Sequence, residues 1–285
     1  PDNVREDPAP ADPDEAPDAE EFRDAYRELF SPRLPQPDRM SAAYHIPGRM
    51  QPGLHRIMTA KLPANKLKER AKEAGATVTE YLAGAYIYTL YTIWEADRRR
   101  ERNQQAIRLE VPVDMRRIHP SKTMRNFSLF VMPGIDLRLA PYTLQDIVQT
   151  VHHSMRLQRD PREIKRQIAR NVGGELNPLV RVIPLLLKDW YLSSLHNRLG
   201  ARIASGVFSN IGNVELPQAM ADHVSDLTFV LGPNLGLRKT VSAVSYRGTL
   251  NVTVGSVTAS REFERIYFST LAKQGVPVSV LEPQL

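Results

Sequence analysis

The sequence contains no cysteine, which excludes disulfides and cysteine-based zinc or iron–sulfur sites. This absence fits a reducing cytoplasm, where we expect the protein to reside. No apolar run reaches the ~18–20 residues that a transmembrane helix needs, so no membrane span is expected. Aromatic residues make up 7% of the chain, without the aromatic box or recognition helix of nucleic-acid-binding proteins. Nucleic acid is therefore not an expected partner.

Charge is distributed unevenly along the chain. Residues 1–28 hold eleven Asp and Glu and three Arg, a local charge of −8, so the remainder must carry +14 to reach the total of +6. Residues 1–20 contain five prolines and almost no large apolar side chain, which is typical of an extended linker. Residues 21–30 have apolar side chains at helical spacing, which predicts a short docking helix. We therefore divide the chain into an arm, 1–40, and a folded subdomain, 41–285.

Predicted helices and strands alternate through the folded part. Thr77 and Glu80 have the spacing of a capping box, and Arg247-Gly248 predicts a tight turn between two strands. The predicted helices are 66–74, 77–94, 144–157, 162–170, 177–199 and 260–274, the last beginning at Ser260 and ending at Gly275. The predicted strands are 55–60, 107–114, 126–137, 204–209, 226–231, 240–246, 249–256 and 276–281. This interleaving predicts an α/β or α+β protein with a mixed sheet.

Several common catalytic and metal-binding patterns are absent from the sequence. Five of the seven histidines stand alone, and none has the i, i+4 spacing of a helical metal-binding pair, so no metal site is expected. The serine in 206–210 falls one place too late for a nucleophile elbow. The glycines in 232–240 are too close together for a phosphate-binding P-loop.

Four segments carry a recognisable pattern: V-P-V-D-M-R-R at 111–117, R-N-F at 125–127, S-N-I-G-N-V at 209–214 and S-Y-R-G-T-L-N-V-T-V at 245–254. In order and spacing they resemble the alcohol O-acetyltransferase-like branch of the CoA-dependent acyltransferase superfamily. This superfamily includes chloramphenicol acetyltransferase, the condensation domains of nonribosomal peptide synthetases and wax-ester synthases. The resemblance covers about residues 54–281.

The resemblance implies a fold and a place within it. Such proteins have two similar halves with a tunnel between them, and this chain is similar to the C-terminal half, with residues 1–40 similar to the linker. The implied architecture is one half of a chloramphenicol acetyltransferase-like fold. That half is a two-layer sandwich with a mixed, largely antiparallel sheet covered by helices.

The histidine motif of the family, H-H-x-x-x-D-G, is missing. Its second His acts as the general base and lies in the N-terminal half. The pair His152-His153 is followed by Leu157 and Gln158 where the motif has Asp and Gly, and it falls in a predicted helix. We interpret it as a helix-surface pair and assign no catalytic residue. The chain alone is expected to be inactive.

Three explanations stay open for the missing motif. An N-terminal half is omitted from this chain, or it is a separate chain, or the protein is a non-catalytic relative that binds a partner or lipid. In the first two cases the N-terminal half is the expected partner. A chain without it would expose an apolar face, from which a homodimer is the further expectation.

Some residues match the family pattern position by position. Arg116 and Asn126 would pin strand ends by hydrogen bonds. Ser209 and Asn210 match a strand end that faces the tunnel, where they would stabilise an oxyanion or simply cap the strand.

The resemblance also implies the substrates. The co-substrate would be acyl-CoA or an acyl-carrier thioester, and the acceptor a small-molecule alcohol or amine. Arg238 and Lys239 are candidates for binding the phosphates of CoA, the alternative being a solvated loop. No permanently bound cofactor is expected.

Overall fold

The computed structural model describes residues 18–35, 40–51, 53–97, 104–176, 201–233 and 236–281, together with the single residues 16 and 37. The acidic residues 1–15 and the predicted helix at 177–199 lie outside the described residues.

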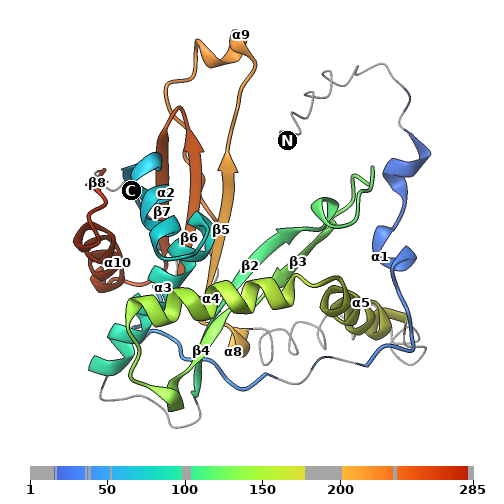
Figure 1. The fold of residues 1–285 in the computed structure, drawn as a ribbon, viewed down its shortest axis with the longest axis horizontal. Coiled ribbons are helices and arrows are strands. Elements are labelled where there is room, and N and C mark those ends of the chain that lie inside the picture. Colours follow the sequence, from blue (N-terminus) through green and yellow to red (C-terminus); the bar gives the residue numbers. More distant parts are fainter. Residues whose placement is uncertain are drawn as a thin grey trace.

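Within these residues, eight strands form one sheet in the order β3-β2-β5-β6-β7-β1-β8, with β4 also paired to β2 (Figure 1). Only the pairs β2–β5 and β5–β6 are parallel, and the others are antiparallel. The sheet is therefore mixed and largely antiparallel, as predicted. The strands are β1 (Arg56–Pro63), β2 (Ala106–Asp114), β3 (Ser128–Val131), β4 (Gly134–Asp136), β5 (Gly206–Asn213), β6 (Lys239–Tyr246), β7 (Thr249–Ser256) and β8 (Ser279–Val280).

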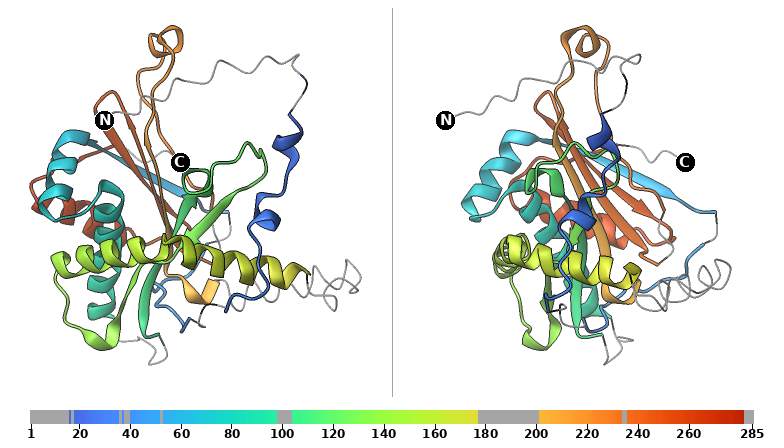
Figure 2. Two further views of the ribbon diagram at one scale, coloured as in Figure 1. Left: turned by 45° about the vertical axis from the view of Figure 1, so that its right-hand side comes forward. Right: turned by 90° about the vertical axis from the view of Figure 1, so that its right-hand side faces the viewer.

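One face of the sheet is covered by the helices α2 (Ala64–Glu73), α3 (Val78–Ala96), α4 (Leu144–Gln158) and α10 (Glu262–Lys273) (Figure 2). Their apolar side chains and those of the central strands form the main core. Among the described residues, the other helix of more than one or two turns is α5 (Pro161–Leu176), which follows α4 directly. Short helical turns in the described residues are η1 (Ala19–Phe22), α1 (Ala25–Glu28), η2 (Met115–Arg117), η3 (Leu137–Leu139), α8 (Ala201–Ile203) and α9 (Gln218–Ala221).

Helix α3 is the centre of the main core. The Thr77 hydroxyl accepts the Glu80 N–H and the Glu80 carboxylate accepts the Thr77 N–H, so the predicted capping box begins the helix. Most of the helix is buried on all sides. A Cβ at Gly84 would overlap the Val148 side chain, so this glycine allows α4 to pack closely on α3. The helix predicted over 77–94 is confirmed.

A second, smaller hydrophobic cluster lies beside the main core. It joins the arm to the end of the β2–β3 hairpin and to α5, and we call it the satellite core. Its buried members are Ala25, Met115, Phe127, Leu129, Ile164, Ile168 and Val172. The Tyr26 ring packs edge-on against Phe127 with centroids 5.1 Å apart, and its hydroxyl donates to the Ser128 carbonyl. The predicted docking helix 21–30 is in fact two short turns, η1 and α1. This segment does pack against the rest of the chain, through Ala25 and Tyr26.

Two strand predictions need correction. The described segment 226–231 is extended but joins no strand ladder, because side chains bind its carbonyls instead. Ser242 Oγ donates to the Phe229 carbonyl at 2.6 Å, and Asn251 Nδ2 donates to the Leu227 carbonyl at 2.6 Å. The predicted strand 126–137 is divided into β3 and β4 at 132–133, where Pro133 has no N–H to donate.

The bounds of two other elements also differ from the prediction. The last helix begins at Glu262 with Arg261 at its N-cap, although the Ser260 hydroxyl does accept the Glu262 N–H at 3.3 Å. The closing strand, predicted over 276–281, pairs only at β8.

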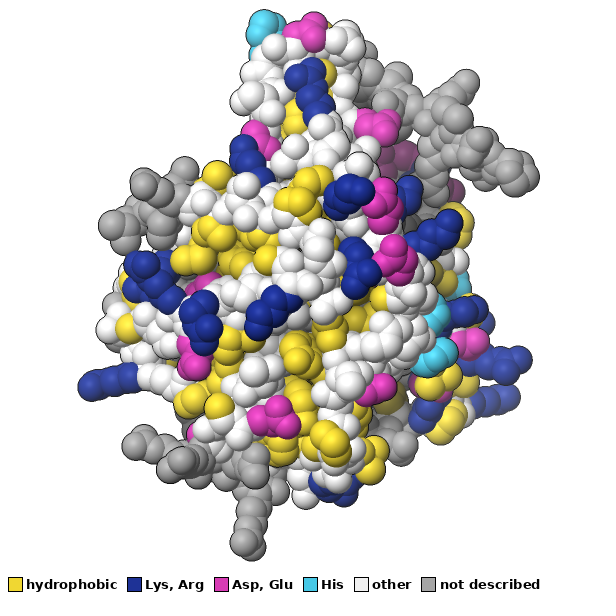
Figure 3. Space-filling model, turned by 60° about the vertical axis from the view of Figure 1, so that its left-hand side comes forward, with side chains coloured by type: hydrophobic (Ala, Val, Ile, Leu, Met, Phe, Trp, Pro, Cys, Tyr) yellow, Lys and Arg dark blue, Asp and Glu magenta, His cyan; other side chains and the backbone are white. Residues whose placement is uncertain are grey.

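The side of the molecule that carries α2 and α10 shows apolar patches separated by Lys and Arg side chains (Figure 3). No helix in the described ranges is both long enough and apolar enough to cross a lipid bilayer.

Candidate functional site

A cleft opens where two parallel strands separate. β2 and β5 pair only at Leu109↔Gly206 and Glu110↔Val207, after which β2 pairs with β3 and β5 with β6. A cavity of about 640 Å³ lies between the diverging strand ends. In open α/β sheets, the carboxyl ends of separating parallel strands are where ligands commonly bind.

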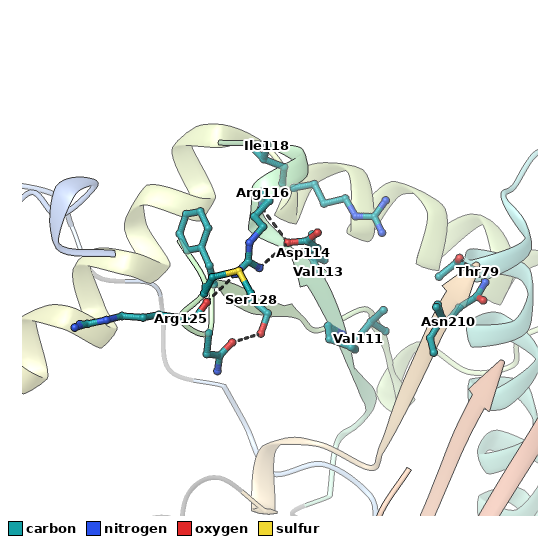
Figure 4. A pocket seen from close by; sticks show the side chains of 15 residues that line it. Thr79, Val111, Val113, Asp114, Arg116, Ile118, Arg125, Ser128 and Asn210 are labelled. Atoms are coloured by element: carbon teal, nitrogen blue, oxygen red, sulfur yellow. Dashed lines mark hydrogen bonds and ion pairs between the residues drawn. The ribbon is translucent and has the colours of Figure 1, made fainter. Parts of the chain in front are cut away.

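The two walls of this cleft come from different parts of the molecule (Figure 4). One wall belongs to the satellite core and contains Asp114, Arg116 and Ser128. The opposite wall belongs to the main core and contains Thr79 of α3 and Asn210 of β5. The cleft is thus a junction between two separately packed units.

Arg116 and Asn126 both lie on the satellite wall. The Arg116 guanidinium donates to the Thr123 carbonyl at 2.7 Å and to the Arg125 carbonyl at 2.8 Å. It also lies 3.4 Å from Asp114. The Asn126 side-chain oxygen accepts the Ser128 hydroxyl at 2.8 Å. These bonds hold the loop after β2 against the strand ends, so Arg116 has a structural task at the cleft.

Ser209 and Asn210 are separated by the pleat of β5. Asn210 lines the cleft, where its Nδ2 donates to Thr79 Oγ1 at 3.0 Å and its Oδ1 accepts the Gly212 N–H at 3.0 Å. Phe208 is fully buried in the main core on the helix side, so Ser209 projects from the opposite face of the sheet. Ser209 is not among the residues that line the cleft.

Arg238 and Lys239 lie at the start of β6, away from this cleft. Lys239 Nζ is 2.7 and 2.9 Å from the two carboxylate oxygens of Glu264 and 2.9 Å from the Ser260 carbonyl oxygen. Both side chains of the pair are 1% exposed. Burial lowers the Lys239 pKa and the Glu264 carboxylate opposes this. A phosphate cannot reach this ammonium without breaking the pair. The Arg238 guanidinium donates to the Ile46 carbonyl.

His152 and His153 lie on α4, as the helical interpretation required. His152 Nδ1 is 3.0 Å from the Glu80 carboxylate, whose side chain is 4% exposed, whereas His153 is exposed. Although burial alone would raise it, the pKa of Glu80 is lowered because the Thr77 N–H and the His152 ring bind the carboxylate. The His152 ring thus helps to hold the first turn of α3.

Comparison with known proteins supports the fold. No protein family model and no curated protein matches the chain. Among solved structures, the chain is similar to the TRI3 trichothecene 15-O-acetyltransferase from Fusarium sporotrichioides, with a TM-score of 0.54 and 14% identity. It is also similar to the nonribosomal peptide synthetase FmoA3, with a TM-score of 0.53 and 17% identity. The chain has the acyltransferase/condensation-like fold.

This acyltransferase/condensation-like fold is the one that the motifs at 111–117, 209–214 and 245–254 predicted. The similarity covers 83% of this chain in both comparisons, but 48% of the acetyltransferase and 24% of the synthetase. The chain therefore spans about half or less of the structures that it matches.

Two arginines that line the cleft were not expected from the sequence. Arg159, which follows the last turn of α4, and Arg125, in the loop before β3, both line it. Among the described residues, neither side chain makes an ion pair, and Arg159 Nε is buried without a hydrogen-bond partner. Among the described residues that line the cleft, Asp114 is the one acid, and it is paired with Arg116. The cleft is therefore cationic.

Proposed function

We propose that the chain is the C-terminal subdomain of an acyltransferase that moves an acyl group from a CoA or carrier thioester to an alcohol or amine. The observation that carries this proposal is the cationic cleft at the diverging ends of β2 and β5, in a fold similar to that of an acetyltransferase. Both kinds of thioester donor carry phosphate, which arginine binds through charge-assisted hydrogen bonds.

In this proposal the chain supplies binding surface and the chemistry lies elsewhere. A general base must lie within hydrogen-bond reach of the acceptor, and His152 is engaged with Glu80. The base would therefore be a histidine of an N-terminal half that packs across the cleft. Arg125 and Arg159 would orient the donor, and the apolar lining residues Val113, Ile118 and Ile211 would contact its less polar parts.

The intact protein tests this proposal. Its reading frame upstream of Pro1 should encode H-H-x-x-x-D-G, and substitution of the second His by Ala should abolish acyl transfer from acetyl-CoA. Arg159→Glu should raise the KM for the thioester by about tenfold with little change in kcat, because it removes binding common to ground and transition states. Arg156→Glu is the matched control, since Arg156 is exposed in the last turn of α4 and does not line the cleft. An upstream reading frame that does not encode H-H-x-x-x-D-G would contradict the proposal.

A non-catalytic module of the same fold is the alternative. It is favoured by the two hydrogen bonds that hold the Asn210 amide to Thr79 and Gly212, which leave only one Nδ2 hydrogen for a reacting oxyanion. Thioester turnover by the intact protein that depends on the upstream histidine would exclude this alternative.

A further inference from the structure

The arm meets the molecule at the rim of the cationic cleft. The Asp18 carboxylate is 2.9 Å and the Glu20 carboxylate 3.7 Å from Lys122 Nζ. The Met124 N–H donates to the Glu21 carbonyl at 2.9 Å, and the Thr123 hydroxyl donates to the Arg23 carbonyl at 2.7 Å. These contacts fix the arm to the loop 121–126, whose Met124 and Arg125 line the cleft.

The sequence that precedes this attachment is strongly acidic. Residues 1–15 contain six Asp and Glu and one Arg. Asp12, Asp14 and Glu15 are only three to six residues before Asp18. A chain spans at most ~3.6 Å per residue, so all three carboxylates stay within roughly 30 Å of Lys122 whatever their backbone conformation, side chains included.

The cleft offers positive charge to this acidic segment. Arg125 and Arg159 line it without an ion-pair partner in the described part of the chain, and its one acid is already paired. Tethering at the rim raises the effective concentration of the acidic segment to the millimolar range. Weak exposed ion pairs, which would not hold a free peptide, can then be populated.

We propose that Asp12, Asp14 and Glu15 bind in the cationic cleft against Arg125 and Arg159 and compete there with anionic ligands. Two observations favour this segment: its charge is opposite to that of the cleft, and it is attached next to the cleft. The proposal concerns occupancy of the cleft and holds whether or not the intact protein transfers acyl groups.

A spin label tests the occupancy directly, and the absence of cysteine allows a single attachment site. Ala11→Cys in the full 285-residue chain is labelled with a nitroxide, and broadening of backbone amide signals is measured by NMR. We expect broadening at Arg125, Arg159 and Ile211 at low salt. It should disappear in the D12N/D14N/E15Q variant and at 1 M salt, where the Debye length falls to about 3 Å.

A second set of variants changes the arginines of the cleft and leaves the acidic residues in place. Arg125→Gln with Arg159→Gln should remove the broadening, whereas Arg156→Gln, on the exposed side of α4, should leave it in place. Equal broadening of the cleft amides in the unaltered and the neutralised chains, or none in either, would overturn the proposal.

Competition is measured with inorganic pyrophosphate as the probe. The D12N/D14N/E15Q chain should bind it about threefold to tenfold more tightly than the unaltered chain, as expected from a few exposed ion pairs. Equal affinities of the two chains for pyrophosphate would contradict the proposed competition. Failure of acyl transfer in the intact protein is a separate readout and bears only on the proposed function.

Discussion

The main core and the satellite core are built in different ways. The main core surrounds α3 with strands paired over eight residues on each side of β7, and it includes a buried ion pair. The satellite core joins short pieces, the arm, the end of a hairpin and α5, around a few large side chains. The strand that leads from it to the centre of the sheet, β2, pairs with β5 over only two residues.

This difference teaches where the molecule can move. Long paired strands and fully buried helices open only with the whole domain, whereas short elements with few buried contacts open locally. Because the cleft lies between the two cores, its width depends on the weaker of them.

The largest effect is expected in the main core at Lys239. Lys239→Met leaves Glu264 buried without its partner and should lower the free energy of unfolding by about 3–5 kcal/mol. Lys239→Met with Glu264→Leu should recover most of this loss, since a buried ion pair is often replaceable by apolar residues. Urea denaturation measures both variants. A double variant as unstable as the single one would show that the pair itself carries the stability.

The next effect concerns the contact of α3 with β5. Tyr86 donates its hydroxyl to the Lys239 carbonyl at 2.7 Å, and a Cβ at Gly206 would overlap that hydroxyl. Gly206→Ala should destabilise by about 3 kcal/mol, the upper end of typical overpacking. Adding Tyr86→Phe should restore part of the lost free energy of unfolding. The measurement is again the urea midpoint, and no restoration would rule out the steric explanation.

A smaller and local effect is expected in the satellite core. Tyr26→Ala removes the ring from Phe127 and the hydrogen bond to Ser128, which should cost about 1–2 kcal/mol. Amide hydrogen exchange should accelerate in 18–30 and 121–128 while β6 and β7 stay protected. Tyr26→Phe, which keeps the ring, should have the weaker effect. Faster exchange in β6 and β7 would mean that the two cores open together.

The smallest effect is pH-dependent and lies at the start of α3. The pKa of Glu80 is lowered in the folded state, so its carboxylate stabilises the fold above the ordinary pKa that it has in the unfolded chain. This contribution should be lost as pH falls through the lower, folded pKa. Glu80→Gln should therefore be less stable by about 1 kcal/mol at pH 7, with the difference vanishing in acid. Urea midpoints between pH 2 and pH 7 measure it, and a difference independent of pH would contradict the assignment.

The sequence predicted the elements whose signals are local. The Thr77–Glu80 box and the Arg247-Gly248 turn depend on residues a few positions apart, and the structure contains both. The strand predicted over 226–231 was wrong. The conformation of this segment depends on Ser242 and Asn251, which are distant in sequence and whose side chains donate to its carbonyls. The apolar run Leu227–Leu231 alone cannot reveal such partners.

The site was less predictable than the fold for the same reason. Lys239 looked like a loop cation, yet Glu264, 25 residues later, pairs with it inside the core. Arg159 carried no motif, since only the packing of α4 on α3 brings it to the ends of β2 and β5. The sequence shows an excess of positive charge outside the arm, but the fold decides which of these cations remain available to a ligand.

The division of the cleft between two hydrophobic clusters has a consequence for how its specificity can evolve. Substitutions whose neighbours do not overlap change stability almost additively. A change at Ile118 or Met124 on the satellite wall leaves the packing around Thr79 and Asn210 untouched, since these belong to the other wall. Selection can therefore alter the shape of one side of the cleft while the main sheet keeps its sequence.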